Sequence, residues 1–261
     1  MKRHEGKTML VTGAAGAIGF ATCRILAEEG ARVMLVDIVE DRLHARTAEL
    51  KAAGHDAHAF HADCADEAQV KAYAQAALDA FGHVDGFFNN AGIEGILAPT
   101  HEYPVEEFDH VLHVNLRGMF LGLRHVLPAM VARGRGAVVN TASIGSERGL
   151  AGACAYNAAK HGAVGLTRTA ASEVAQKGVR VNCVEPGVIE TPLLVGMLEQ
   201  MFDSVEAGMA KLGEVATLNR VGQPEEVGQV VSFLLSDEAS YVNGARWEID
   251  GGALATIRND V

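Results

Sequence analysis

The sequence is poor in positive charge and contains no long apolar run. Lysine and arginine together number 22, against 33 aspartate and glutamate residues, which gives a formal net charge of −11. This deficit argues against a nucleic-acid partner, because such binding depends on basic side chains that neutralise phosphates. No window approaches the run of about 18 apolar residues that a membrane-spanning helix needs, so we expect no membrane association.

The chain also lacks the cysteine spacing of a disulfide framework. Its four cysteines, Cys23, Cys64, Cys154 and Cys183, lie far apart, and no Cys-x-x-Cys pair occurs. Free thiols in a reducing compartment explain this pattern most simply. The N-terminal stretch "MKRHEGKTMLVTG" has neither the apolar segment nor the cleavage site of a signal peptide. We therefore expect a cytoplasmic protein.

Two patterns that could indicate other chemistry are incomplete. His55, His58 and His61 recur at every third position. On a strand this spacing alternates between faces, so we predict no metal site there or elsewhere. The segment "NTASIGS" contains serines but not the G-x-S-x-G turn of many hydrolases. Neither a metalloenzyme nor a serine hydrolase is supported.

Short apolar runs alternate with amphipathic segments of helical length along the whole chain. Strands are predicted at residues 8–13, 32–37, 56–63, 84–92, 136–143, 179–187 and 245–252. Helices are predicted at residues 17–29, 39–53, 66–81, 105–132, 156–176 and 225–235. Apolar strands between helices indicate a seven-stranded parallel sheet covered on both faces. With no linker or repeat, residues 1–261 are expected to form a single doubly wound α/β domain of the Rossmann type.

The least regular segment is residues 192–218. It is rich in methionine and leucine and is interrupted by glycines. This composition fits an ordinary pair of surface helices, and it fits equally well a mobile lid over a substrate. Both interpretations stay open at the level of sequence.

A glycine-rich turn follows the first predicted strand. Gly13, Gly16 and Gly19 lead into the first helix, and Asp37 ends the second strand 18 residues beyond Gly19. Glycines allow a pyrophosphate to approach the backbone, where the amides at the helix N-terminus bind it. A carboxylate at the end of the second strand can accept hydrogen bonds from a ribose.

The spacing of this turn, T-G-x-x-x-A-x-G, resembles that of the short-chain dehydrogenase/reductase family. Further motifs of the family follow in order: "NNAG" at 89–92, Asn115, Ser143, "YNAAK" at 156–160, "PGVIETP" at 186–192 and "DGG" at 250–252. Each motif is weak alone, but the ordered set spans nearly the whole chain. The stretches "NNAGIEG", "NLRGMFLGL" and "NTASIG" resemble members that act on cyclic alcohols, diols and ketones.

The resemblance implies a bound nicotinamide dinucleotide. Its contacts are expected from the glycine turn and from the loops after the strands: Gly13, Ala15, Gly16, Ala17, Ile18, Gly19, Asp37, Ile38, Asp63, Cys64, Asn90, Ala91, Gly92, Tyr156, Lys160, Pro186, Gly187, Val188, Ile189 and Thr191. Asp37 repels a 2′-phosphate, and no basic residue stands at Ala14 or Ala15, so the expected cofactor is NAD. Cys64 departs from the aliphatic residue usual in the family, but a thiol is a small hydrophobe.

The resemblance also implies the catalytic residues Asn115, Ser143, Tyr156 and Lys160. Tyr156 and Lys160 are four residues apart, which places both on one helix face. Taken alone, the pair could be a half-exposed helical turn with a lysine reaching solvent. As a catalytic pair, the ammonium and the positive nicotinamide ring lower the pKa of the phenol, which then acts as acid and base.

In this scheme Ser143 binds the substrate oxygen, and Asn115 distorts its helix and holds a water in a proton relay. We predict oxidation of a secondary alcohol to a ketone, or the reverse. The expected substrate is compact, cyclic and apolar, and it contacts Ser143, Ile144, Leu150, Tyr156, Glu94, Ile96, Leu193, Leu194 and Met197. Two alternatives stay open: a non-catalytic NAD-binding scaffold or redox sensor, and a reductase of 3-ketones bound to an acyl carrier.

A homotetramer is expected from the family, whose members bury the helices that carry Asn115 and Tyr156 between subunits. Gly118, Gly122, Ala163 and Gly165 are taken as the small outward residues of these helices. Near the substrate, Glu94 and Arg148 are the only charged candidates, and because the two could pair with each other, a neutral substrate is favoured over a strongly anionic one.

Overall fold

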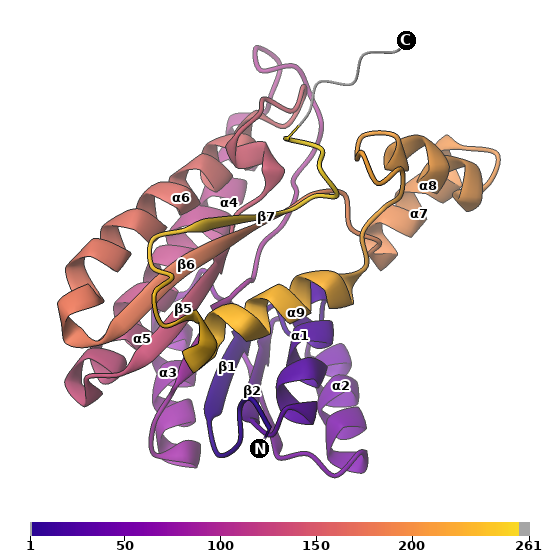
Figure 1. Cartoon of the computed structure of the whole chain (residues 1–261). Coiled ribbons are helices and arrows are strands. Elements are labelled where there is room, and N and C mark those ends of the chain that lie inside the picture. The colour runs from indigo at the N-terminus through magenta and orange to yellow at the C-terminus, as the bar shows by residue number, and fades with distance from the viewer. Residues whose placement is uncertain (1, 256–261) are drawn as a thin grey trace.

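The computed structural model describes residues 2–255, without the side chains of residues 193, 196, 197, 200 and 201. Within this part of the chain, seven strands form one parallel sheet in the order β3-β2-β1-β4-β5-β6-β7 (Figure 1). The strands are β1 (Thr8–Thr12), β2 (Arg32–Asp37), β3 (Ala57–His61), β4 (Gly86–Asn89), β5 (Gly136–Thr141), β6 (Val179–Pro186) and β7 (Arg246–Ile249). The predicted seven-stranded Rossmann-type sheet is confirmed. Its strand order reverses between β1 and β4, where such sheets bind their ligands.

Helices cover both faces of the sheet because its strands are apolar on both sides. On one face lie α1 (Ala17–Glu28), α2 (Glu40–Ala52) and α9 (Pro224–Leu235) (Figure 1). On the other lie α3 (Glu67–Phe81), α4 (Val105–Leu112), α5 (Gly118–Arg133) and α6 (Cys154–Val174). Met9 and Val11 pack toward the first group, whereas Leu10 between them packs toward the second. No helix within residues 2–255 is long and apolar enough to cross a bilayer.

The helix predicted at 105–132 is divided in three. Between α4 and α5 lies a π-helical turn, η1 (His113–Arg117), which contains Asn115. The cause is local: the Asn115 amide bonds to both backbone groups of Ile93, with the Ile93 N–H donating to Oδ1 and Nδ2 donating to the Ile93 carbonyl, each at 2.7 Å. The expected distortion of the helix at Asn115 is therefore present.

Residues 192–213 form an arm of two helices, α7 (Pro192–Met201) and α8 (Val205–Gly213), which projects from one end of the molecule (Figure 1). The arm has a small core of its own, because Leu198 is fully buried and a Cβ atom on Gly208 would lie only 2.7 Å from it. The expected helix pair is thus present. Its movement as a lid stays a prediction.

The outward positions assigned to α5 and α6 are largely wrong. Gly118 packs against the carbonyl of Cys64 and Gly122 against the side chain of Asn89, and Ala163 is fully buried in a cluster with Cys183. These small residues allow helices to approach the sheet and its loops. Gly165 alone faces open space.

Candidate active site

The turn after β1 fits a bound pyrophosphate. Gly13 has a φ of +61°, and a Cβ atom there would lie 3.0 Å from both Ala91 Cα and Asn90 Nδ2. A Cβ atom on Gly19 would collide with the carbonyl oxygen of Gly13. Gly16 caps α1 without a side-chain hydrogen bond, and no acidic residue lies in the first turn. The positive helix end is therefore left to an anion.

The segment that contains Asn90, Ala91 and Gly92 is fastened to the end of β1. Thr12 Oγ1 accepts hydrogen bonds from the Asn90 N–H at 2.9 Å and the Ala91 N–H at 3.2 Å. Asn90 Nδ2 donates to the Thr12 carbonyl at 3.1 Å, and Thr141 Oγ1 donates to Asn90 Oδ1 at 3.0 Å. These bonds bring the predicted ribose-binding segment beside the glycine turn, across the switch point of the sheet.

Asp37 holds the same turn from its other side. Its carboxylate accepts from the Ala15 N–H and from the Val39 N–H, each at 2.9 Å, and it is 8% exposed. The neighbouring Ile38 is 58% exposed. The structure therefore places a carboxylate where the sequence predicts a contact with the adenosine ribose.

The predicted adenine contacts follow β3. Asp63 Oδ1 accepts from the Ala65 N–H at 2.8 Å, which orders the turn before α3. Burial, together with the charges of Asp37 and Asp63, raises the pKa of the Cys64 thiol to about 12. Cys64 therefore stays an uncharged thiol and can serve as a small apolar contact.

The predicted nicotinamide segment continues from β6 into the arm. The Gly187 N–H donates to the carbonyl of Ile249 in β7, and the Val188 carbonyl accepts from the Gly222 N–H, each at 3.0 Å. Thr191 Oγ1 accepts from the Leu194 N–H at 3.2 Å and so caps α7. The segment is therefore held at both ends, and it begins at the carboxyl end of β6, directly after Pro186.

The four predicted catalytic residues come together beneath these loops. Lys160 is 4% exposed, its Nζ donates to the carbonyl of Thr141 at 2.8 Å, and it lies 5.5 Å from the centre of the Tyr156 ring. The Ser143 hydroxyl lies near enough to the Tyr156 phenol to lower its pKa. A Cβ atom on Gly92 would lie 3.1 Å from Asn115 Oδ1 and 3.7 Å from Lys160 Nζ, so both side chains flank Gly92.

Burial shifts the pKa values of both Tyr156 and Lys160 toward their uncharged forms. Burial raises the pKa of Tyr156, and the charge of Glu94 raises it further, while the hydrogen bond from Ser143 lowers it. Burial also lowers the pKa of Lys160 to about 8. Burial therefore opposes the phenolate within the protein itself. The predicted lowering at Tyr156 depends on the positive nicotinamide ring as well as on Lys160, and it stays a prediction.

Two residues of this site, Thr141 and Ser146, are not predicted from the sequence. Thr141 holds both Lys160, through its carbonyl, and Asn90, through its hydroxyl. Ser146 Oγ donates to the Lys160 carbonyl at 3.0 Å and accepts from the Ser143 N–H at 3.3 Å. Ser146 follows Ser143 by three residues, which is the spacing of a capping box, and that signal could have identified it.

The predicted substrate contacts lie on two neighbouring loops. The Ala98 N–H donates to the Gly152 carbonyl at 3.0 Å, which joins the loop of Glu94 and Ile96 to that of Leu150. Ile96 is 44% and Leu150 41% exposed, whereas Ser143 and Ile144 are buried at the base.

Other predictions on the substrate side are corrected or stay open. Arg148 donates to the carbonyl of Ala253, so its hydrogen bond goes to the C-terminal turn and not to Glu94. Leu194 contributes its N–H to the cap of α7. The side chains of Leu193 and Met197 lie outside the described residues.

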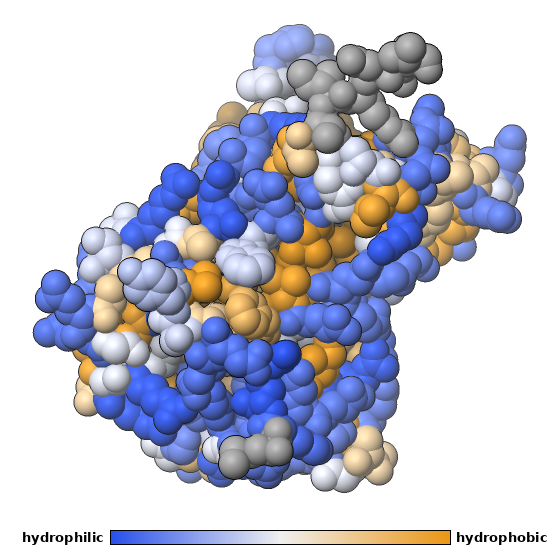
Figure 2. Space-filling view, viewed as in Figure 1, coloured by the Kyte–Doolittle hydropathy of each residue, from blue (hydrophilic) through white to orange (hydrophobic). Residues whose placement is uncertain are grey.

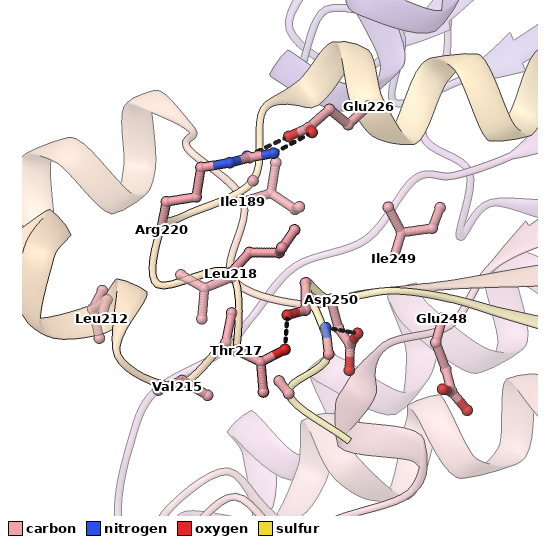
Figure 3. Close-up of a pocket in the computed structure, with 16 residues that line it drawn as sticks. Ile189, Leu212, Val215, Thr217, Leu218, Arg220, Glu226, Glu248, Ile249 and Asp250 are labelled. Atoms are coloured by element: carbon pink, nitrogen blue, oxygen red, sulfur yellow. Dashed lines mark hydrogen bonds and ion pairs between the residues drawn. The ribbon is translucent and has the colours of Figure 1, made fainter. Parts of the chain in front are cut away.

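A pocket of about 460 Å³ opens at the base of the arm (Figure 3). Its wall includes Val188, Ile189, Leu212, Leu218 and Ile249, but none of the predicted catalytic residues. The hydroxyl of Thr217 donates to the Gly251 carbonyl at 2.8 Å, which ties the return from α8 to the end of β7. Figure 2 shows apolar surface in this hollow beside the arm. The pocket touches the predicted nicotinamide segment from the side of β7 and is separate from the predicted substrate loops.

Comparison with known proteins agrees with this architecture. A family model described as "Enoyl-(Acyl carrier protein) reductase" matches residues 13–253. The chain is 44% identical to levodione reductase of Leifsonia aquatica over 97% of its own length and 96% of the relative's. It is 42% identical to cyclohexanol dehydrogenase of Acinetobacter sp. (strain SE19), with 95% of each chain covered.

Solved structures show the same fold. Levodione reductase superposes with a TM-score of 0.93 over 98% of this chain and all of its own. NAD⁺-bound xylitol dehydrogenase, 32% identical, gives 0.90 over 96% of this chain and 100% of its own. A variant of actinorhodin polyketide ketoreductase with NADPH, 35% identical, also gives 0.90, over 95% and 97%. The chain is therefore a member of the short-chain dehydrogenase/reductase family, and it resembles members that act on cyclic alcohols and ketones.

Proposed function

We propose that the protein interconverts a compact, apolar cyclic alcohol and its ketone by transferring a hydride to or from NAD. The observation that carries the proposal is the contact set around Tyr156: a hydroxyl from Ser143 at its phenol and a buried ammonium from Lys160 under its ring. The names of the relatives, levodione reductase and cyclohexanol dehydrogenase, support the substrate class.

Each residue has a separate task in this mechanism. The nicotinamide ring of the bound cofactor accepts or supplies the hydride. Tyr156 takes the hydroxyl proton of the alcohol, or returns it to the ketone, and Ser143 donates a hydrogen bond to the substrate oxygen as charge develops there. Lys160, whose ammonium donates to the Thr141 carbonyl, provides positive charge beside the phenol. Asn115 accepts a hydrogen bond from the Ile93 N–H and so fixes the backbone that follows Gly92.

The proposed preference for NAD over NADP rests on Asp37. Its buried carboxylate faces the region after β2 and accepts from the N–H of Ala15, whose own side chain offers no positive charge to a 2′-phosphate. One structural relative is bound to NAD⁺ and another to NADPH, so the family alone does not decide the cofactor. The ratio of kcat/KM with the two cofactors tests the preference, and equal values contradict it.

The test of the substrate class is a rate comparison with NAD at alkaline pH. The panel consists of cyclohexanol-type alcohols, short linear alcohols, sugar polyols and β-hydroxyacyl thioesters, followed through absorbance of the reduced nicotinamide. The cyclic alcohols are expected to give the highest kcat/KM. A lead of more than about tenfold for polyols or thioesters, roughly 1.4 kcal/mol of transition-state preference, contradicts the cyclic substrate. A thioester lead favours the acyl-carrier alternative.

We further propose a cytoplasmic homotetramer. The described cysteines are all free thiols, which agrees with a reducing compartment. On the helices in question, Gly165 faces open space and Phe120 is 44% exposed, so both are available to a second copy. Light scattering should give a mass near 110 kDa, four times the 27.5 kDa of one chain. A monomeric mass at micromolar concentration contradicts the tetramer.

A further inference from the structure

Glu185 is a buried acid that the proposed chemistry does not use. It lies in β6, one residue before Pro186, and it is fully buried. Within the described residues, neither of its carboxylate oxygens has a hydrogen-bond partner. A buried carboxylate without a donor is costly in its charged form, so such a group is held neutral or draws a nearby cation toward it.

The nearest cation is Arg246 of β7, the edge strand beside β6. Its Nη1 lies 3.6 Å from Glu185 Oε1, too far for a hydrogen bond, and it forms a close ion pair with Glu147. Glu147 follows the short helical turn η2 (Ile144–Ser146), directly after Ser143. The guanidinium of Arg246 therefore lies between the buried carboxylate of Glu185 in the sheet and the partly exposed carboxylate of Glu147 in the loop after Ser143.

Other charges around Glu185 set where it titrates. Burial and the carboxylates of Glu248 and Asp250 raise its pKa, Arg168 of α6 lowers it, and the result is a pKa of about 7. Cys183, on the same face of β6, is an uncharged thiol because burial raises its pKa to about 12. Glu185 thus changes charge in the neutral pH range.

The loop between Ser143 and Leu150 is attached to the end of the sheet by two arginine contacts. One is the ion pair of Glu147 with Arg246, and the other is the hydrogen bond from Arg148 to the carbonyl of Ala253. Of these two contacts, only the ion pair with Glu147 uses an arginine, Arg246, that also lies beside Glu185. The side chains of Glu147 and Arg246 are 35% and 25% exposed, so solvent weakens their pair, whereas the buried Glu185 is not screened.

We propose that Glu185 and Arg246 are positioning residues for the substrate loop: on ionisation, Glu185 draws Arg246 away from Glu147 and loosens the segment between Ser143 and Leu150. At lower pH, neutral Glu185 leaves Arg246 to Glu147 and the loop is held. The proposal depends on the proposed function only where substrate kinetics serve as its readout.

The first test does not depend on activity. Hydrogen exchange of the amides in residues 144–150 is compared between pH 6 and pH 8, after correction for the intrinsic pH dependence of exchange. We expect up to about fivefold faster exchange at pH 8 in the native protein, the equivalent of an outer ion pair worth about 1 kcal/mol. Glu185→Gln, which mimics the neutral acid, should keep the slower exchange at both pH values.

Two further variants separate a switch from a merely structural role. Glu147→Gln removes the titration-sensitive contact, so its loop should exchange fast at both pH values. Arg148→Lys weakens the other contact and should keep the native pH dependence. A Glu185→Gln protein with the native pH dependence, or a Glu147→Gln protein with the native protection at pH 6, overturns the proposal.

Kinetics with cyclohexanol and NAD add a second measurement. The KM for the alcohol is expected to rise by up to about fivefold from pH 6 to pH 8 in the native enzyme and to stay constant in Glu185→Gln, while the pH profile of kcat is the same in both. A native enzyme that turns over no cyclic alcohol contradicts the proposed function but leaves the exchange result to decide the role of Glu185. A KM that rises equally in both proteins contradicts the positioning role.

Discussion

The nucleotide end and the arm are built on different physical principles. Around the end of β1, the side chains of Thr12, Asp37 and Asn90 hold backbone groups of the surrounding turns with hydrogen bonds. The arm consists of two short helices packed on each other, tied to the sheet by bonds such as that from Thr217 to Gly251. The loops predicted to contact the substrate expose Ile96 and Leu150.

This difference separates what the family shares from what distinguishes its members. A pyrophosphate demands one backbone geometry, which restricts the residues at the nucleotide end. A substrate is met by side chains on loops, which can change without disturbing the sheet. The proposed catalytic residues belong to the first kind, because Lys160 and Asn115 are fixed through backbone groups of Thr141 and Ile93.

The largest predicted effect tests whether Tyr156 acts as the acid and base of the proposed reaction. Tyr156→Phe should lower kcat by about 10²- to 10⁴-fold and leave cofactor affinity nearly unchanged, because only the ionisable hydroxyl is lost. Tyr73→Phe is the matched control, since Tyr73 is fully buried and its hydroxyl has no hydrogen-bond partner in the structure. Steady-state kinetics and NAD titration measure both. If the Tyr156→Phe enzyme keeps more than about a tenth of native kcat, Tyr156 is not the acid and base of the reaction.

A second prediction compares two helical glycines. Gly19→Ala places a methyl group against the Gly13 carbonyl, so it should abolish detectable NAD binding or prevent folding. Gly165→Ala meets open space on α6 and should raise the free energy of unfolding by about 0.5–1 kcal/mol. Urea unfolding and calorimetric titration with NAD give both quantities. Native NAD affinity in Gly19→Ala contradicts the close approach at the turn.

The same contrast explains which features can be predicted from the sequence. Strand and helix periodicity predicts the sheet, and glycine spacing predicts the turn, because both follow from local geometry. The directions of Gly118, Gly122 and Ala163 cannot be found this way, since they depend on which loop or strand each helix meets. The raised pKa of Tyr156 depends on burial, and the partner of Arg148 lies 105 residues away. Long-range contacts of this kind have no signal in one sequence.

Cofactor choice gives an effect of intermediate size. Asp37→Ser removes a negative charge and shortens the acceptor that holds the Ala15 and Val39 amides. We expect kcat/KM with NAD to fall by about tenfold and the ratio of NADP to NAD activity to rise, in line with the loss of a charge-assisted hydrogen bond. Asp66→Ser is the control, because Asp66 caps α3 and serine preserves a cap. An unchanged cofactor ratio in Asp37→Ser contradicts the assignment.

The smallest predicted effect links the exposed substrate loop to the buried phenol. The charge of Glu94 raises the pKa of Tyr156, so Glu94→Gln should lower that pKa. Alcohol oxidation needs the deprotonated phenol, so kcat rises as the pH increases through the pKa of Tyr156. This rising part of the kcat profile should therefore move to lower pH. Because Glu94 is exposed, the shift should amount to a few tenths of a pH unit and should shrink in about 1 M salt. Glu102→Gln, at another exposed acid of the region, should leave this part of the profile in place. A shift to higher pH in Glu94→Gln, or an equal shift in both variants, shows that the loop does not act on Tyr156 through its charge.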